Sequence, residues 1–133
     1  MSRFRARLAH GDRGASSLEL AMLGPVVILL TFIVVQFALW YHAKNVAQAA
    51  VEAGARAARG YQATDADGTQ AALDAFNSLG GPKVTNGTPQ IVPTRNGTNV
   101  SMDLRTQSIA LLPGITLPIN VTAGGPIEQF VGP

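Results

Sequence analysis

Residues 13–43 read RGASSLELAMLGPVVILLTFIVVQFALWYHA, and this stretch decides how the rest of the chain can fold. After Glu19 it carries no formal charge for about 24 residues, from Leu20 to Ala43. About 20 consecutive apolar residues are enough for a helix to cross the hydrocarbon core of a bilayer. The run therefore predicts one transmembrane segment at about residues 20–43.

A single carboxylate stands at the start of this run. Glu19 comes five residues after Gly14, and an arginine-rich leader precedes that glycine. A charged side chain in lipid is costly, so its presence at the membrane demands a reason. The combination indicates a segment that both lies in the bilayer and leaves it.

The leader also explains the charge of the chain. The sequence pI is about 9.5, but four of the ten basic residues precede Ala15. Without residues 1–14, six basic residues face seven acidic ones. Arginines beside a first span hold that end in the cytoplasm. The remaining cations are scattered, which argues against a nucleic-acid-binding surface.

Residues 15–60 are predicted to form one long helix whose character changes midway. Trp40 and Tyr41 mark an aromatic belt at the outer membrane interface. Within the apolar half, Gly24-Pro25 removes one backbone donor and crowds the preceding turn. A kink or local melting is expected there, either as an ordinary feature of a membrane helix or with a role in function.

The second half of this helix is alanine-rich, which favours helix strongly. Ala50, Gly54 and Ala58 recur every four residues, and small residues at this spacing let another backbone approach closely. Gln36 lies deep in the apolar run. It is expected either to hydrogen-bond across packed helices or to be an ordinary satisfied polar side chain.

The part after residue 60 reads as a small mixed domain. Residues 61–68 are expected to form a polar connection and residues 69–79 an amphipathic helix, which Gly80-Gly81-Pro82 ends. β-strands follow, with a hairpin at Asn96-Gly97. The expected strands are 90–94, 99–104, 117–122 and a short edge strand within 126–133.

The fold class that follows is α+β. It has three parts: a basic leader (1–14), the long helix (15–60) and a small extracytoplasmic domain (61–133). A domain of that last size makes a marginal core. We expect the preceding helix, or neighbouring copies of the chain, to complete it. The chain has 133 residues and no cysteine, so it has no disulfide or thiolate metal site.

Several of these segments together resemble the TadE-like family of bacterial tight-adherence (Tad/Flp, type IVc) pilus systems. Gln36-Phe37 occupies the place of that family's usual glutamate-phenylalanine pair. The segments that carry the resemblance are Arg13-Gly14 with the following Ala15–Glu19, Gly24-Pro25, Gln36-Phe37, the Gly-Ala-Arg helix at 49–58, and residues 112–128.

The resemblance implies a structural subunit, a minor pilin or pseudopilin, with no cofactor. Prepilin peptidase would cleave after Gly14 and leave Ala15 as the new N-terminus. In a staggered filament, Glu19 of one copy could meet the Ala15 amine of the next, and pairing the two charges lowers the cost of burying each. The other interpretation of Glu19 is a carboxylate at the headgroup boundary that the helix dipole favours.

The same resemblance implies partners and a location. The partners are prepilin peptidase, other pilins and the Tad assembly machinery. The sequence leaves open whether the outer domain contacts DNA, a surface or only sibling proteins. The chain would first span the cytoplasmic membrane once, with its N-terminus in the cytoplasm, and then enter an extracellular pilus.

Two other classes of protein stay open at this stage. One is a permanently anchored single-pass protein that displays a small binding module. The other is a secreted protein cleaved near Ala47-Gln48-Ala49, although the apolar run is longer than a signal-peptide core. We find no catalytic constellation in the sequence, so an enzyme is not expected.

Overall fold

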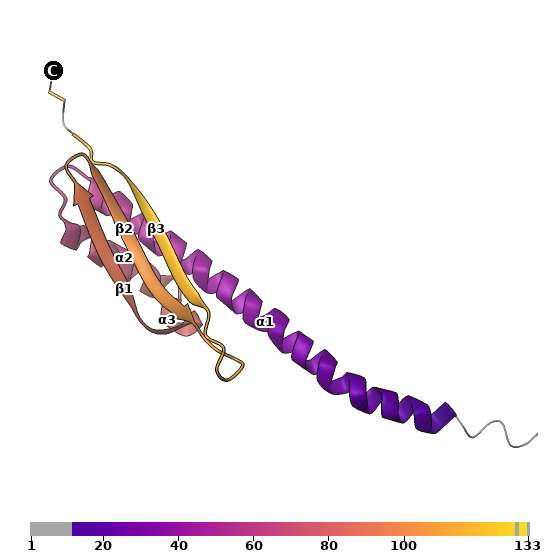
Figure 1. Ribbon diagram of the computed structural model, residues 1–133. Coiled ribbons are helices and arrows are strands. Elements are labelled where there is room, and N and C mark those ends of the chain that lie inside the picture. Colours follow the sequence, from indigo (N-terminus) through magenta and orange to yellow (C-terminus); the bar gives the residue numbers. More distant parts are fainter. Residues whose placement is uncertain (1–11, 130, 133) are drawn as a thin grey trace, which may run out of the picture. The chain divides into compact units, whose positions relative to one another are not determined.

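A computed structural model describes residues 12–129 and 131–132, with side chains from Ser16 onward (Figure 1). The chain divides into two compact units, Met1–Val35 and Gln36–Pro133. Helix α1, Asp12–Arg59, contributes to both units. This long N-terminal helix, followed by a small mixed domain, confirms the α+β class.

In the first unit the described chain is all helix. α1 begins at Asp12, three residues before the expected start at Ala15. The start expected from the sequence was therefore wrong for residues 12–14, because a glycine inside a helix costs only about 1 kcal/mol relative to alanine and does not end it. Residues 1–11 of the leader lie outside the described residues.

The second unit contains the rest of α1 and all the other elements. Two further helices follow α1, α2 at Asp65–Ser78 and α3 at Gly81–Val84. Three strands follow, β1 at Thr85–Asn96, β2 at Asn99–Ser108 and β3 at Pro118–Pro126. They form one antiparallel sheet in the order β1-β2-β3, so each strand pairs with its neighbour in sequence (Figure 1).

The hairpin predicted at Asn96-Gly97 is present, with its turn one residue later. Asn96 pairs with Asn99, so the two-residue turn is Gly97-Thr98. Gly97 has a φ of 44° and no positive φ occurs at Thr98. A two-residue hairpin turn of this kind needs a positive φ at its first central residue, and glycine adopts a positive φ without strain. The glycine thus sets the register, and Asn96 ends the strand.

The core of the second unit lies between one face of the sheet and the helices. Alternate residues of β2 are buried, namely Val100, Met102 and Leu104, and Ile119 and Val121 of β3 join them. Seven small or medium residues of α1 between Ala43 and Ala58 belong to the same cluster. Because a three-stranded sheet this small cannot enclose a core alone, the helix supplies the opposite side. The expectation that the helix completes the core is confirmed.

α2 begins four residues earlier than expected from the sequence. Thr64 caps it by accepting from the backbone N–H of Asp67, and the Asp67 carboxylate accepts from the backbone N–H of Thr64 at 2.8 Å. This reciprocal capping box satisfies two N–H groups at the helix start. The spacing Thr64-x-x-Asp67 was visible in the sequence, so the polar connection assigned to 61–68 was too long.

Three other expectations need correction. Gly80-Gly81-Pro82 ends α2, but a single helical turn, α3, follows directly with Pro82 in its first turn. Proline is tolerated there because the N–H that it lacks would have no partner within the helix. β1 is longer than expected and contains an irregularity between Asn86 and Gln90. The edge strand expected within 126–133 does not form over residues 127–129, since the Glu128 N–H bonds to the Arg59 carbonyl instead of to a strand.

Candidate membrane and assembly stem

The first unit presents an apolar surface that no described residue of that unit covers. We call the described residues 16–35 of α1 the stem. Its large apolar side chains are all exposed by two-fifths or more, and Val34 by 67%. Exposed apolar patches of this extent mark a surface made for lipid or for other protein chains. Among the described residues, α1 is the helix long and apolar enough to cross a membrane.

Glu19 lies near the start of the stem and is exposed. No other acidic residue occurs before Glu52 on the side-chain-resolved part of α1. Gly14 and Ala15 lie in the first turns of the same helix. The peptide bond between them is therefore helical, five residues from the carboxylate along the chain.

Gly24 and Pro25 lie inside the stem, and α1 keeps its helical assignment through both. A Cβ added at Gly24 would meet no atom within 4 Å. No neighbour in the unit thus requires glycine there. Pro25 still removes one backbone hydrogen bond of the helix, which makes this the weakest point of the stem.

Gln36, the first residue of the second unit, is only 3% exposed. Its amide Nε2 donates to the carbonyl of Ile109 at 2.9 Å, and its Oε1 accepts from the N–H of Leu111 at 2.7 Å. Both ends of the amide are therefore satisfied within the chain, by the loop between β2 and β3. A buried amide left without these partners would cost about 1–3 kcal/mol.

Ala50, Gly54 and Ala58 all face the core of the second unit. A Cβ on Gly54 would lie 2.7 Å from both the Cβ of Ala72 and the carbonyl oxygen of Gly68. The close backbone approach that small residues permit is thus used by α2 of the same chain.

Trp40 and Lys44 form the boundary between the apolar and polar parts of α1. The indole Nε1 donates to the carbonyl of Pro118 at 3.2 Å, and the ring lies 5.5 Å from that of Phe37. Lys44 Nζ lies 5.4 Å from the centre of the indole ring, within the range of a cation–π interaction. This cluster has the amphipathic character of side chains at a membrane interface.

Arg95 has a structural role that the sequence did not reveal. Its guanidinium pairs with Asp65 at 2.8 Å and donates to the carbonyls of Ala58 and Ala63 at 3.1 and 3.3 Å. It therefore satisfies a carbonyl at the end of α1 and ties the α1–α2 connection to β1. A lone arginine in a strand carries no signal for this, because its partners are distant in sequence.

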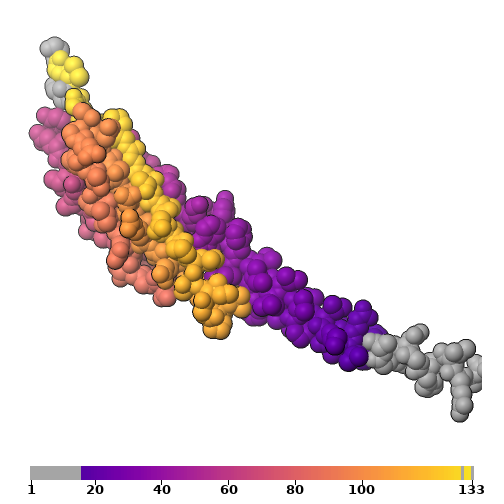
Figure 2. All heavy atoms as spheres, viewed as in Figure 1, coloured from indigo at the N-terminus to yellow at the C-terminus, as the bar shows by residue number. Residues whose placement is uncertain are grey.

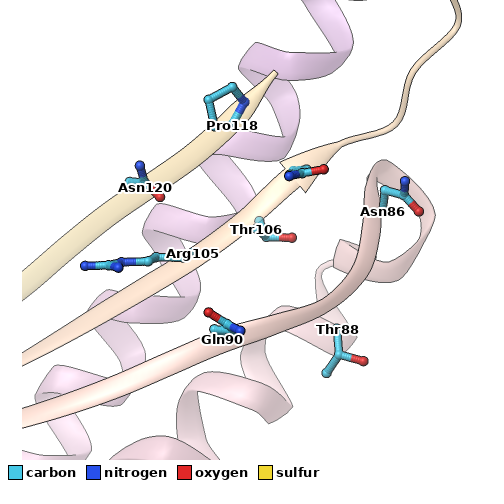
Figure 3. A pocket seen from close by; sticks show the side chains of 8 residues that line it. Asn86, Thr88, Gln90, Arg105, Thr106, Pro118 and Asn120 are labelled. Atoms are coloured by element: carbon cyan, nitrogen blue, oxygen red, sulfur yellow. The ribbon is translucent and has the colours of Figure 1, made fainter. Parts of the chain in front are cut away.

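The face of the sheet turned away from the core is polar. Gln90, Arg105 and Asn120 stand directly opposite one another on the three strands and line a shallow, open hollow (Figure 3). Nearby, the hydroxyl of Thr122 donates to the carboxylate of Asp103 across the strands. This face carries both hydrogen-bond donors and hydrogen-bond acceptors, and its described residues form no charge cluster.

The comparisons with known proteins bear on the stem and on the helix that continues it. Residues 14–56 match the family model described as TadE-like protein. This segment is TadE-like. The TadE-like match begins at Gly14 and ends inside the alanine-rich half of α1, so residues 112–128 lie outside it. Neither the search of curated proteins nor the search of solved structures found a match.

The TadE-like match supports a subunit related to the Tad pilus. TadE-like pilins are structural proteins rather than enzymes. The exposed apolar helix near the N-terminus is long and apolar enough to span a membrane.

Proposed function

We propose that the chain is a minor pilin or pseudopilin of a Tad-like (type IVc) pilus. The observation that carries this proposal is the bare apolar stem, which begins next to Arg13-Gly14 and lies within the TadE-like segment. Such a surface needs lipid before assembly and other subunits afterwards. The chain first crosses the cytoplasmic membrane once, with its arginine-rich end in the cytoplasm.

Prepilin peptidase cleaves between Gly14 and Ala15. This bond lies in the first turn of α1, where helices fray and where backbone N–H groups have no partner within the helix. A protease needs an extended substrate, and glycine lowers the cost of leaving the helix by about 1 kcal/mol. The position near the helix start and the residue type both favour access to this bond.

After cleavage, Glu19 sets the register between neighbouring stems. The new α-amino group on Ala15 is charged at neutral pH. A stagger between copies brings this amine to the Glu19 carboxylate of the next subunit, and each charge reduces the cost of burying the other. The exposed position of Glu19 leaves it free for that contact. Residues 61–133 then form an outer domain that contacts other pilins.

The buried positions of α1 have a separate part in this proposal. Gln36, Ala50, Gly54 and Ala58 are occupied by contacts within the chain. They hold the outer domain on its helix, and the exposed stem residues are available for packing between subunits. Gly24 and Pro25 give the stem a soft point where it bends as it leaves the bilayer.

The register contact is tested by replacing Glu19 with alanine in the native host. Glu19→Ala should leave membrane insertion and cleavage intact and should reduce the number of pili severalfold. The matched control is Glu52→Ala, which removes an exposed carboxylate from the alanine-rich half of the same helix and should leave piliation unchanged. Normal piliation in Glu19→Ala would refute the register role.

The alternative is a permanently anchored protein that displays a binding module. It would keep residues 1–14 and would not need Glu19. Cleavage and copurification with pilus components separate the two functions, because only a pilus subunit should have both.

A further inference from the structure

The loop between β2 and β3 is unusually apolar for a connection at the surface. We call residues 109–117, IALLPGITL, the apolar loop. Leu111 is 41% exposed and Ile115 is 46% exposed, and no charged residue occurs between Arg105 and Glu128. Loops normally carry polar residues because they face water. Figure 2 shows this loop, in orange-yellow, protruding at the end of the sheet where β2 ends and β3 begins.

The position of the apolar loop along α1 is fixed by Gln36 and Trp40. Gln36 bonds to the backbone of Ile109 and Leu111, and Trp40 donates to the carbonyl of Pro118, the first residue of β3. These contacts hold both ends of the loop against successive turns of the helix. The depth of the loop therefore follows the depth of Gln36.

Gln36 belongs to the uncharged part of α1. Lys44 is the first charged residue after Glu19. It lies eight residues beyond Gln36, which is about 12 Å along a helix. When Lys44 and Trp40 lie at the headgroups, Gln36 and the loop beside it lie at the edge of the acyl chains. The amide of Gln36 would be costly there alone.

Backbone groups in lipid must also be satisfied within the protein. Gln36 supplies partners for one carbonyl and one N–H of the loop. The N–H of Ile109 bonds to the carbonyl of Val84, and the N–H of Ile115 bonds to the carbonyl of Leu112. The loop thus exposes apolar side chains and pairs part of its backbone within the protein.

We propose that the apolar loop is a second membrane contact, which inserts Leu111 and Ile115 into the leaflet on the Lys44 side while the subunit waits for assembly. The occupant of this surface is lipid, because the loop has no charge and is held beside Gln36 in the uncharged part of α1. Segments of this kind lie at the boundary between headgroups and acyl chains. The inference depends on the proposed function in one respect, that α1 crosses the membrane.

The absence of cysteine makes a direct test possible. Three single-cysteine variants of the full chain are labelled with an environment-sensitive dye and reconstituted into vesicles of phosphatidylethanolamine and phosphatidylglycerol. They are Ile115→Cys in the loop, Val92→Cys on the outer face of the sheet, and Val27→Cys in the stem. Val92 is 49% exposed, close to Ile115 at 46%, so it is a matched control. Quenching is measured with lipids that carry a nitroxide near the headgroup or at mid-chain.

The dye at Ile115→Cys should emit to the blue of the dye at Val92→Cys and should be quenched several-fold more by the shallow nitroxide. The dye at Val27→Cys should be quenched most by the mid-chain nitroxide. If Val27→Cys is quenched but Ile115→Cys behaves like Val92→Cys, the loop inference is overturned and the membrane span stands. If Val27→Cys is not quenched either, both the span and the loop inference fail.

Discussion

The two halves of α1 have opposite relations between residue size and burial. In the stem, bulky residues such as Ile28, Leu30 and Phe32 are about half exposed. In the second half, small residues such as Ala47, Ala50 and Ala58 are fully buried. A soluble helix would show the reverse, since large apolar side chains gain most from burial.

The difference shows that the two halves are built for different surroundings. The second half needs small residues because the sheet and α2 come close to its backbone, as they do at Gly54. In the proposed function the stem needs bulky residues because its partners are lipid chains or the stems of other subunits. Substitutions that are costly in one half should therefore be nearly neutral for folding in the other.

The largest effect is expected from removing a buried aromatic ring in the second unit. Phe76 of α2 is fully buried, so Phe76→Ala should lower the free energy of unfolding by about 3–5 kcal/mol. Phe32 of the stem is 44% exposed, and Phe32→Ala should change it by less than about 0.5 kcal/mol. Urea unfolding of the full chain in detergent micelles, followed by circular dichroism, measures both. Equal losses would remove the contrast between the halves.

A pair of glycines gives the second comparison. Gly54→Val places new atoms against Ala72 and the carbonyl of Gly68, and such overpacking should cost about 1–3 kcal/mol. Gly24→Val meets nothing within the unit and should leave the unfolding free energy of the second unit unchanged. Thermal unfolding of the two variants in the same micelles provides the measurement. A stable Gly54→Val would mean that α2 does not pack closely on α1.

Gln36 marks the point where the two halves meet. Gln36→Leu leaves the carbonyl of Ile109 and the N–H of Leu111 without their partner and should cost about 1–3 kcal/mol. Gln48→Leu removes only a contact with Glu52 one turn away and should cost a few tenths of a kcal/mol. Hydrogen exchange at Leu111 should speed up in the first variant alone. Unchanged exchange there would show that the amide does not hold the loop.

The smallest effect concerns the cap of α2. Hydrogen bonds from the backbone and the hydroxyl of Thr64 hold the pKa of Asp67 below its ordinary value of 3.8. Because the pKa of Asp67 is lower in the folded state, its ionised carboxylate stabilises the fold when the pH is above the ordinary pKa. This contribution is lost as the pH falls through the lowered pKa. Thr64→Ala should raise the pKa of Asp67 in an NMR titration. A pKa already at its ordinary value in the unaltered chain would contradict the capping geometry.

Much of the architecture follows from local sequence signals. The charge-free run and the alanine-rich segment predict one long helix, and the alternation of Val100, Met102 and Leu104 predicts a strand with one buried face. Gly97 marks the hairpin. Each of these signals depends on residues close in sequence, so tertiary contacts are not needed to read them.

The features that the sequence did not predict depend on distant partners. The pairing of Gln36 with the apolar loop joins residues about 75 positions apart, and Arg95 reaches back to the end of α1. The strand expected near the C-terminus failed because Glu128 bonds to Arg59 rather than to β3. The capping box at Thr64 and Asp67 was local and could have been found.

The most direct test of the proposed function is the mass of the N-terminal peptide of the native chain. The chain is isolated from cell-surface fibres and from the membrane, and its N-terminal peptide is identified by mass spectrometry. The mature chain should begin at Ala15 and be present in the fibre fraction, and a Gly14→Leu variant should stay uncut in the membrane. A native chain that still begins at residues 1–2 or that starts near Ala50, and that never accompanies fibres, would contradict it.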